Sequence, residues 1–302
     1  MTTQKHCLRI LIILIAALAG LLAAKANALV VLQYHHIADD TPPATSTPPA
    51  KFAEHLAYLK KEGFKVIDLQ TAISAINNQE LPLPKTVLIT FDDGSSTIHD
   101  TALPLLKKYD YPFVVFINTD AVEQKFSHTL TWPQIKELKK HGAAIANHSA
   151  SHTHMVRKLP NESEPAWLAR MRSEIAQAQK LIKKHTGDDY PVFAYPFGEY
   201  NNSLKELLKE LNYIAFGQHS GPFGNFDKQS LPRFPMGGQY GSKEDFALKV
   251  NTQPFEVFNY QLINGTDTAT FDPVMALEQT QPTLAITVKN NAQLKAINCF
   301  LS

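Results

Sequence analysis

The chain has 302 residues, of which 44% are hydrophobic and 19% charged, and its 29 Lys and Arg nearly balance 28 Asp and Glu. This length suits one large α/β domain with a small appendage. The net charge of +1 creates no strong field, which argues against a nucleic acid or an anionic membrane as partner.

The first 28 residues have the pattern of a secretory signal peptide. A basic start precedes an apolar run at residues 10–24, and Ala26-Asn27-Ala28 offers a small-residue cleavage site. We expect export to the periplasm or the medium, with N-terminal sequencing of the exported protein beginning at Leu29. A retained membrane anchor is the alternative, although the apolar run is short for a spanning helix. Intact Met1 in the membrane fraction would favour that anchor.

Cleavage after residue 28 would change the charge and the cysteine content. The mature chain would carry 26 basic and 28 acidic residues, a net charge of −2. Cys7 would be lost and Cys299 would be the only cysteine, so no intramolecular disulfide could form. We therefore expect a mature protein with no nucleic-acid partner and no stable membrane insertion.

From residue 30 to residue 234, the predicted strands and helices alternate along the chain. In chain order, we predict a strand at 30–36, a proline-rich loop at 41–49, a helix that Gly63 ends, a strand at 64–69, a helix at 69–76 and a strand at 86–89. Next come a helix around 102–106, a strand at 112–118, a helix from the capping box of Thr131 and Gln134 to Lys140, and a strand at 143–147. The last are a helix at 164–185, a strand at 192–195, a helix at 204–211, and strands at 213–217 and 231–234.

This alternation predicts a parallel sheet of seven or eight strand–helix units, closed or nearly closed into a barrel. Active sites of such barrels lie at the carboxyl ends of the strands. After about residue 251, the segments 255–263 and 282–288 alternate apolar and polar residues, as antiparallel strands do. We predict a signal peptide at 1–28, a barrel domain at 29–250, and a β-rich extension at 251–302 that is too short for much of a core.

Two adjacent carboxylates, Asp92 and Asp93, follow the predicted strand at 86–89. Their mutual repulsion is costly unless something offsets it. A cation that binds one carboxylate and leaves the other free would explain the pair. The alternative is a loop with two solvated aspartates, or a cap for the helix that follows.

Two histidines, His148 and His152, follow the predicted strand at 143–147. Histidines four residues apart on one face of a helical turn can bind the same ion. The spacing alone is common on surface helices, but its combination with an Asp-Asp pair at another strand end is more specific. Asp93, His148 and His152 would form a two-histidine, one-carboxylate site with open positions for water and substrate.

These motifs resemble those of the polysaccharide deacetylases of the NodB-homology type, carbohydrate esterase family 4. Residues 90–94 match the T-F-D-D-G motif, residues 148–152 match H-[ST]-x-x-H, and Pro196-Phe197-Gly198 matches the Pro-aromatic-Gly turn. The resemblance covers roughly residues 30–250. Tyr34-His35 and Leu231-Pro232-Arg233 further resemble the branch that acts on poly-N-acetylglucosamine.

The resemblance implies a distorted (β/α)7-8 barrel with a small C-terminal β appendage. It also implies a metal-dependent hydrolase that removes N-acetyl groups from an N-acetylglucosamine-containing polysaccharide of the cell envelope or biofilm. The three ligands named above would hold one divalent ion, with zinc as the first choice. Asp92 would be the general base, and a backbone N–H in the turn of Pro196 and Phe197 would help to stabilise the oxyanion.

The general acid departs from the usual family pattern. Most members take it from a late L-x-H motif, which is absent after Arg233. In the poly-N-acetylglucosamine branch an early histidine supplies the proton. Adjacent strand residues face opposite ways, so only one of His35 and His36 can point into the site. We expect His35 to be the acid, with His154 and His219 in reserve.

A second departure concerns the arginine that usually begins the third motif and orients the base. Ala194 stands at that position. Arg233, on a late predicted strand, could supply the missing charge, or it could form a purely structural ion pair. Two further functions stay open: a catalytically silent glycan-binding protein on the same barrel, and a hydrolase of a non-glycan amide.

Overall fold

The computed structural model describes residues 28–78, 80, 85–224 and 227–254, and the backbone of three strands within 257–288. The predicted signal peptide, apart from Ala28, and Cys299 lie outside the described residues, so the predictions on them stand as predictions. Within the described part of the chain, no helix is long and apolar enough to cross a membrane.

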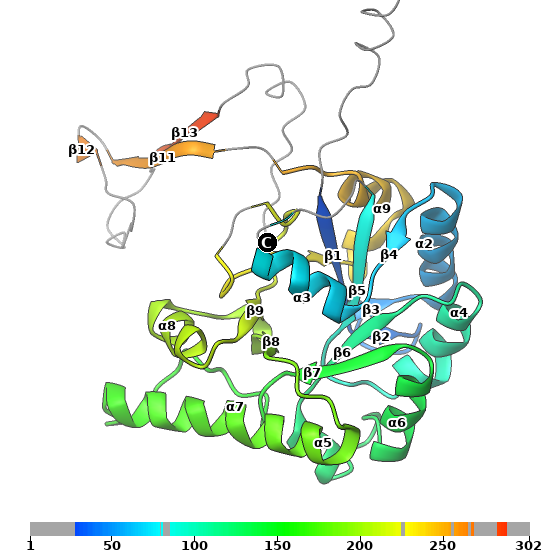
Figure 1. Cartoon of the computed structure of the whole chain (residues 1–302), viewed down its shortest axis with the longest axis horizontal. Coiled ribbons are helices and arrows are strands. Elements are labelled where there is room, and N and C mark those ends of the chain that lie inside the picture. Colours follow the sequence, from blue (N-terminus) through cyan, green and yellow to red (C-terminus); the bar gives the residue numbers. More distant parts are fainter. Residues whose placement is uncertain are drawn as a thin grey trace, which may run out of the picture.

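A parallel sheet of eight strands forms the centre of the molecule (Figure 1). Its strand order is β10-β1-β5-β6-β7-β8-β9, and β4 also pairs with β5. The strands are β1 (Leu29–Tyr34), β4 (Lys65–Val66), β5 (Thr86–Phe91), β6 (Phe113–Ile117), β7 (Ala143–Asn147), β8 (Val192–Ala194), β9 (Ile214–Phe216) and β10 (Phe234–Pro235).

The sheet curls until its two edges nearly meet. Leu231 forms a parallel bridge with Phe216 of β9, and Phe234 of β10 pairs with Leu32 of β1. The segment 231–235 therefore links the two edge strands. The predicted distorted barrel is confirmed, although the last strand is shorter and lies later than expected, because Pro232 has no N–H to give to a ladder.

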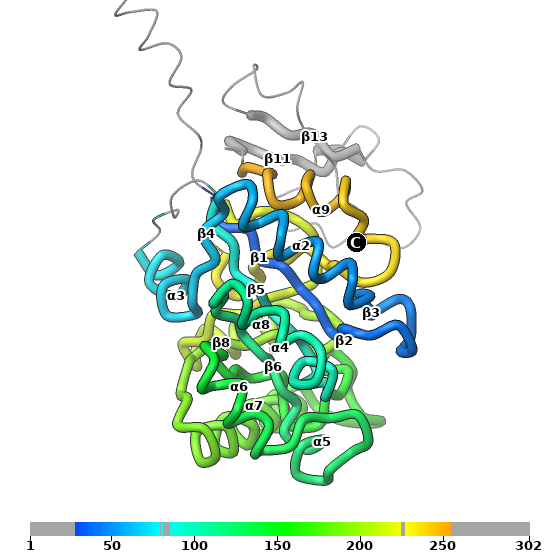
Figure 2. The backbone as a smooth tube through the Cα atoms, turned by 90° about the vertical axis from the view of Figure 1, so that its right-hand side faces the viewer, coloured from blue at the N-terminus to red at the C-terminus, as the bar shows by residue number. Residues whose placement is uncertain are grey.

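Helices cover the outside of the barrel (Figure 1). They are α2 (Pro49–Lys61), α3 (Leu69–Asn78), α4 (Leu103–Lys107), α5 (Thr119–Glu123), α6 (Trp132–Lys140), α7 (Glu164–Thr186), α8 (Asn202–Glu210) and α9 (Lys243–Val250). Short turns are η1 (Pro43–Thr45), η2 (Ile98–Ala102), η3 (Pro196–Gly198) and η4 (Gly238–Gly241), and β2 (His36–Ile37) pairs with β3 (Ser46–Thr47). Figure 2 shows α2 and α9 side by side, although they are far apart in sequence. The predicted capping box of Thr131 and Gln134 is present at the start of α6.

Alternation along the strands separates two apolar layers. One set of strand residues faces the barrel interior and shares an apolar cluster with residues of α3; this set includes Leu29, Val31, Leu88, Val114, Phe116, Ala144, Ala146 and Ala194. The alternate residues pack against the outer helices, including Val30, Leu32, Tyr34, Ile89, Phe91, Val115, Ile117 and Ile145. Toward and beyond the carboxyl ends of β1, β5, β6 and β7, the inner positions are occupied by polar side chains: Gln33, His35, Asp92, Asn118 and His148.

The C-terminal strands are β11 (Val257–Asn264), β12 (Asp267–Thr268) and β13 (Thr283–Val288). They form an antiparallel sheet in the order β12-β11-β13. Strands were expected at 255–263 and 282–288, and they are present. The domain boundaries at residues 28 and 250 are not tested and stay predictions.

Candidate active site

Asp92 is fully buried at the carboxyl end of β5. Arg233 binds both of its oxygens: Nη1 donates to Oδ1 and Nη2 to Oδ2, each at 2.7 Å. Gln33 Nε2 donates a third hydrogen bond to Oδ2 at 2.8 Å. Burial raises the pKa of Asp92, but the charge and hydrogen bonds of Arg233, together with His148 and His35, outweigh it, and the net pKa falls to about 2. Asp92 is therefore ionised at neutral pH, and about one of its four acceptor positions is left for another proton donor.

Arg233 is itself fully buried, in the segment that joins the barrel edges. Its Nε donates to the carbonyl of Gly217 at 2.9 Å, and its guanidinium lies 5.5 Å from the ring centre of Phe116. The two-pronged pairing fixes the plane of the Asp92 carboxylate. The structure thus places the positive charge of Arg233 beside Asp92. Ala194, which stands at the position of the usual motif arginine, has no charge to offer. That this charge serves catalysis stays a prediction.

Asp93 lies one residue further on, with a positive φ of 68° that turns the chain after β5. Its Oδ1 is 3.2 Å from His148 Nε2 and 3.1 Å from His152 Nε2. Burial opposes ionisation of Asp93, but the contacts with both imidazoles lower its pKa well below the usual range. One ligand atom from each of the three residues lies within 4.8 Å of the others. The predicted metal ligands are therefore brought together.

His148 is oriented as a metal ligand. Its Nδ1 donates to the carbonyl of Ala194 at 2.8 Å, which leaves the Nε2 lone pair facing Asp93. Among the described residues, His148 Nε2 and Asp93 Oδ1 are buried atoms without a hydrogen-bond partner of good geometry. Burial lowers the pKa of His148, but Asp93 and Asp92 raise it on balance. Because two electron-pair donors face each other, the residues present fit a divalent metal ion.

The prediction that His148 and His152 share the face of a helical turn is wrong. The residues between them form an irregular loop, in which Ser149 and His152 have φ values of 65° and 54°. The Ser149 N–H donates to Asn147 Oδ1 at 2.9 Å, and the His152 N–H donates to Ser149 Oγ at 3.0 Å. These side-chain bonds stabilise the left-handed backbone that aims both imidazoles at Asp93.

His35 and His36 diverge, as the alternation along a strand predicts. His35 is half-buried and lines a first cavity, together with Asp93, His152, Phe197 and His219. Burial lowers the pKa of His35, although Asp92 and Asp93 oppose this. A proton placed on His35 would therefore be readily donated.

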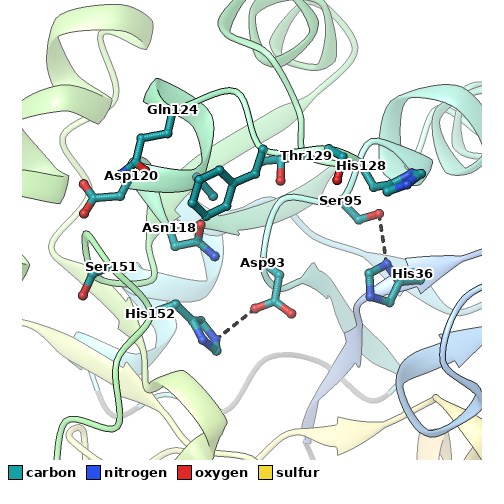
Figure 3. A pocket seen from close by; sticks show the side chains of 13 residues that line it. His36, Asp93, Ser95, Asn118, Asp120, Gln124, His128, Thr129, Ser151 and His152 are labelled. Atoms are coloured by element: carbon teal, nitrogen blue, oxygen red, sulfur yellow. Dashed lines mark hydrogen bonds and ion pairs between the residues drawn. The ribbon is translucent and has the colours of Figure 1, made fainter.

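His36 faces a second cavity, and its Nδ1 lies 3.0 Å from Ser95 Oγ (Figure 3). Asp93 and His152 border this cavity as well. His36 therefore points away from the first cavity, but it shares the second cavity with the proposed metal ligands Asp93 and His152.

The two reserve histidines have different surroundings. His154 Nδ1 lies 2.9 Å from Glu199 Oε2, and its ring stacks on Phe197 at 3.9 Å. His219 lines the first cavity, and its Nδ1 is buried without a hydrogen-bond partner among the described residues. His219 is therefore the better placed of the two.

The predicted turn of Pro196 and Phe197 is the single-turn η3 at the rim of the first cavity. Phe197 has a φ of 59°, and the residue is 45% exposed. Its ring meets the ring of His152 edge-on at 4.6 Å, which supports the orientation of that ligand. The oxyanion role of the turn stays a prediction.

The structure adds two residues that the sequence reasoning missed. Gln33 binds Asp92, and Asn118 follows β6 at a position equivalent to that of Asp92 after β5. Both are polar residues at inward positions near strand ends. Gln33 lies two residues before His35, so the same alternation that selected His35 would have found it.

The chain is similar in sequence to known deacetylases. Residues 80–216 match the family model described as Polysaccharide deacetylase. Through this segment, the chain is similar to the polysaccharide deacetylases. The poly-beta-1,6-N-acetyl-D-glucosamine N-deacetylase of Staphylococcus epidermidis is 27% identical over 195 residues, covering 62% of this chain and 67% of that protein. The chain spans about three fifths of the length of the curated relatives that it matches.

Solved structures of deacetylases share the fold. The Streptococcus pyogenes deacetylase PplD, in complex with acetate, aligns with a TM-score of 0.66 and 25% identity, over 74% of this chain and 99% of that one. IcaB from Ammonifex degensii aligns with a TM-score of 0.65 and 25% identity, over 76% of this chain and 99% of that one. This chain therefore shares its curled parallel barrel with these two structures.

Proposed function

We propose that this protein is a metal-dependent hydrolase that removes N-acetyl groups from an N-acetylglucosamine-containing polysaccharide. The observation that carries the proposal is the juxtaposition of a buried, ionised Asp92 with the Asp93, His148 and His152 cluster at the carboxyl end of the barrel. The names of the relatives support poly-N-acetylglucosamine as the substrate class. The pattern of residues 1–28 supports action outside the cytoplasm, on a glycan of the cell envelope or biofilm.

The proposed metal is zinc, because two imidazoles and one carboxylate with open positions are a common ligand set of catalytic zinc. Asp93, His148 and His152 would hold it. A bound divalent ion supplies Lewis acidity toward a carbonyl oxygen and lowers the pKa of water.

Two side chains, those of Asp92 and His35, carry out the two proton transfers. Asp92 accepts the proton of the attacking water, while Arg233 and Gln33 hold its carboxylate in one plane. His35 gives a proton to the leaving nitrogen, because expulsion of an amide anion is prohibitive. One backbone N–H of the Pro196-Phe197-Gly198 turn stabilises negative charge on the carbonyl oxygen. It is that of Phe197, because Pro196 has no N–H and the Gly198 N–H donates to the Tyr195 carbonyl at 2.9 Å.

Acetate release from N-acetylglucosamine oligomers tests this function. We expect the wild-type protein to release acetate, and the Asp92→Asn variant, purified in parallel, to report any contaminating activity. Oligomer binding without turnover would instead indicate a silent glycan-binding protein. Turnover of an N-acetylated peptide but of no oligomer would contradict the proposed substrate class.

A further inference from the structure

His154 lies two residues after the metal ligand His152, and no step of the proposed mechanism uses it. Its side chain is partly exposed, but the backbone beneath it is firmly held. The next residue, Met155, is 1% exposed, and its carbonyl accepts a hydrogen bond from Trp167 Nε1 at 2.8 Å. The imidazole of His154 therefore projects from a fixed backbone beside the site.

Glu199 orients this imidazole. Its Oε2 lies 2.9 Å from His154 Nδ1, and because an ionised carboxylate can only accept a hydrogen bond, Nδ1 is the donor. The Glu199 N–H donates to the Pro196 carbonyl at 3.2 Å, so Glu199 belongs to the same turn as Phe197. The contact between His154 and Glu199 therefore joins the loop after β7 to the turn after β8.

Phe197 has a backbone conformation that needs support. Its φ of 59° and ψ of 5° lie in the left-handed region, which is unfavourable for a residue with a bulky side chain. Such conformations persist where the surroundings fix them, and they are frequent at functional sites. Because φ and ψ set the direction of the backbone, the placement of the Phe197 N–H depends on whatever holds this residue.

Two histidine rings contact the ring of Phe197. His154 stacks on its face, with ring centres 3.9 Å apart and planes inclined by 12°. His152 meets its edge, with ring centres 4.6 Å apart. A change in the φ of Phe197 would move its ring off His154. The stack on His154 therefore opposes the relaxation of Phe197 to an ordinary backbone conformation.

We propose that His154 and Glu199 are positioning residues for the N–H of Phe197. Glu199 holds the imidazole of His154, the imidazole holds the ring of Phe197, and the ring keeps the backbone at its positive φ. The N–H is then in place before negative charge develops on the carbonyl oxygen of the substrate. This inference rests on the proposed function and deepens it, because it assigns a role to a histidine that neither binds the metal nor transfers a proton.

Replacement of His154 tests the proposal. Acetate release from N-acetylglucosamine oligomers is measured for zinc-loaded wild type, His154→Ala and His154→Phe, with kcat expressed per bound zinc. We expect His154→Ala to lose about tenfold in kcat at unchanged KM, because a displaced oxyanion donor weakens only the transition state. His154→Phe should recover most of that loss, since its ring can still stack on Phe197. Glu199→Ala should lose about threefold, as expected for one hydrogen bond.

His141→Ala is the matched control. His141 Nε2 lies 3.2 Å from Glu137 Oε1, so it makes a similar contact with a carboxylate, but it lines neither cavity. Its replacement should leave kcat unchanged. If His154→Phe is as slow as His154→Ala, the proposal is overturned in favour of proton donation by His154, because phenylalanine has no proton to give. Full kcat in His154→Ala, or a raised KM at unchanged kcat, would overturn it as well.

A failure of the proposed function gives a different result. If wild type releases no acetate, crystal structures of wild type, His154→Ala and His154→Phe still decide the positioning role. The role is supported when Phe197 leaves its positive φ in His154→Ala and keeps it in His154→Phe. A Phe197 that is displaced in both variants, or in neither, rejects it. Because the side chain of His154 is partly exposed, neither replacement threatens the fold.

Discussion

Asp92→Asn should lower the rate of deacetylation by at least about 100-fold while the metal stays bound. The amide cannot accept the proton of the attacking water. Metal binding is spared, because Asp92 is not one of the three clustered ligands. Acetate release and metal content, measured on the same preparation, check both parts of the prediction.

The buried ion pair complicates this experiment, because Asp92→Asn leaves Arg233 buried without its carboxylate. Breaking one side of a buried pair typically costs about 3–5 kcal/mol of unfolding free energy. The double variant Asp92→Asn/Arg233→Met removes both charges and should recover part of that stability. If the double variant is stable and still inactive, the loss is chemical. Substantial activity in either variant would rule out Asp92 as the base.

His35→Ala should also lose at least about 100-fold in deacetylation, because a general acid typically contributes that much or more. His36→Ala should lose far less. Its ring faces Ser95 and the second cavity, whereas His35 faces the first cavity with Phe197. Comparing kcat for the two variants, both loaded with metal, gives the decisive readout.

The two variants also control for each other, since they remove the same ring from neighbouring positions. A crippled His36→Ala beside an active His35→Ala would reverse the assignment of the acid. If both variants stay active, His219 becomes the next candidate, because it also lines the first cavity. The triple measurement of His35→Ala, His36→Ala and His219→Ala therefore identifies the acid, or excludes all three.

The sequence was sufficient to predict the barrel and the edge at which the site lies. Predicted apolar strands alternate with predicted helices, and the apolar residues in both mark the positions that are buried. It also placed Asp92, Asp93 and His148 at strand ends, where the structure has them. Local hydrophobic patterning thus carries most of the fold, because each strand must bury both faces between the barrel interior and a helix.

Other features of the site depend on side-chain and long-range contacts, which the pattern of apolar and polar residues does not reveal. The loop from His148 to His152 is irregular because the side chains of Asn147 and Ser149 hold its backbone, and spacing alone suggested a helix. Arg233 meets Asp92 across 141 residues of sequence. Such tertiary pairings follow from barrel closure and can only be inferred from sequence by analogy with a family.

The most direct test of the central claim is acetate release from N-acetylglucosamine oligomers by protein stripped of metal and then reloaded with zinc. We expect the stripped protein to be inactive, one equivalent of zinc to restore activity, and His148→Ala and His152→Ala to hold less metal and stay inactive. Full acetate release by metal-free protein, or unchanged metal content in both histidine variants, would contradict it.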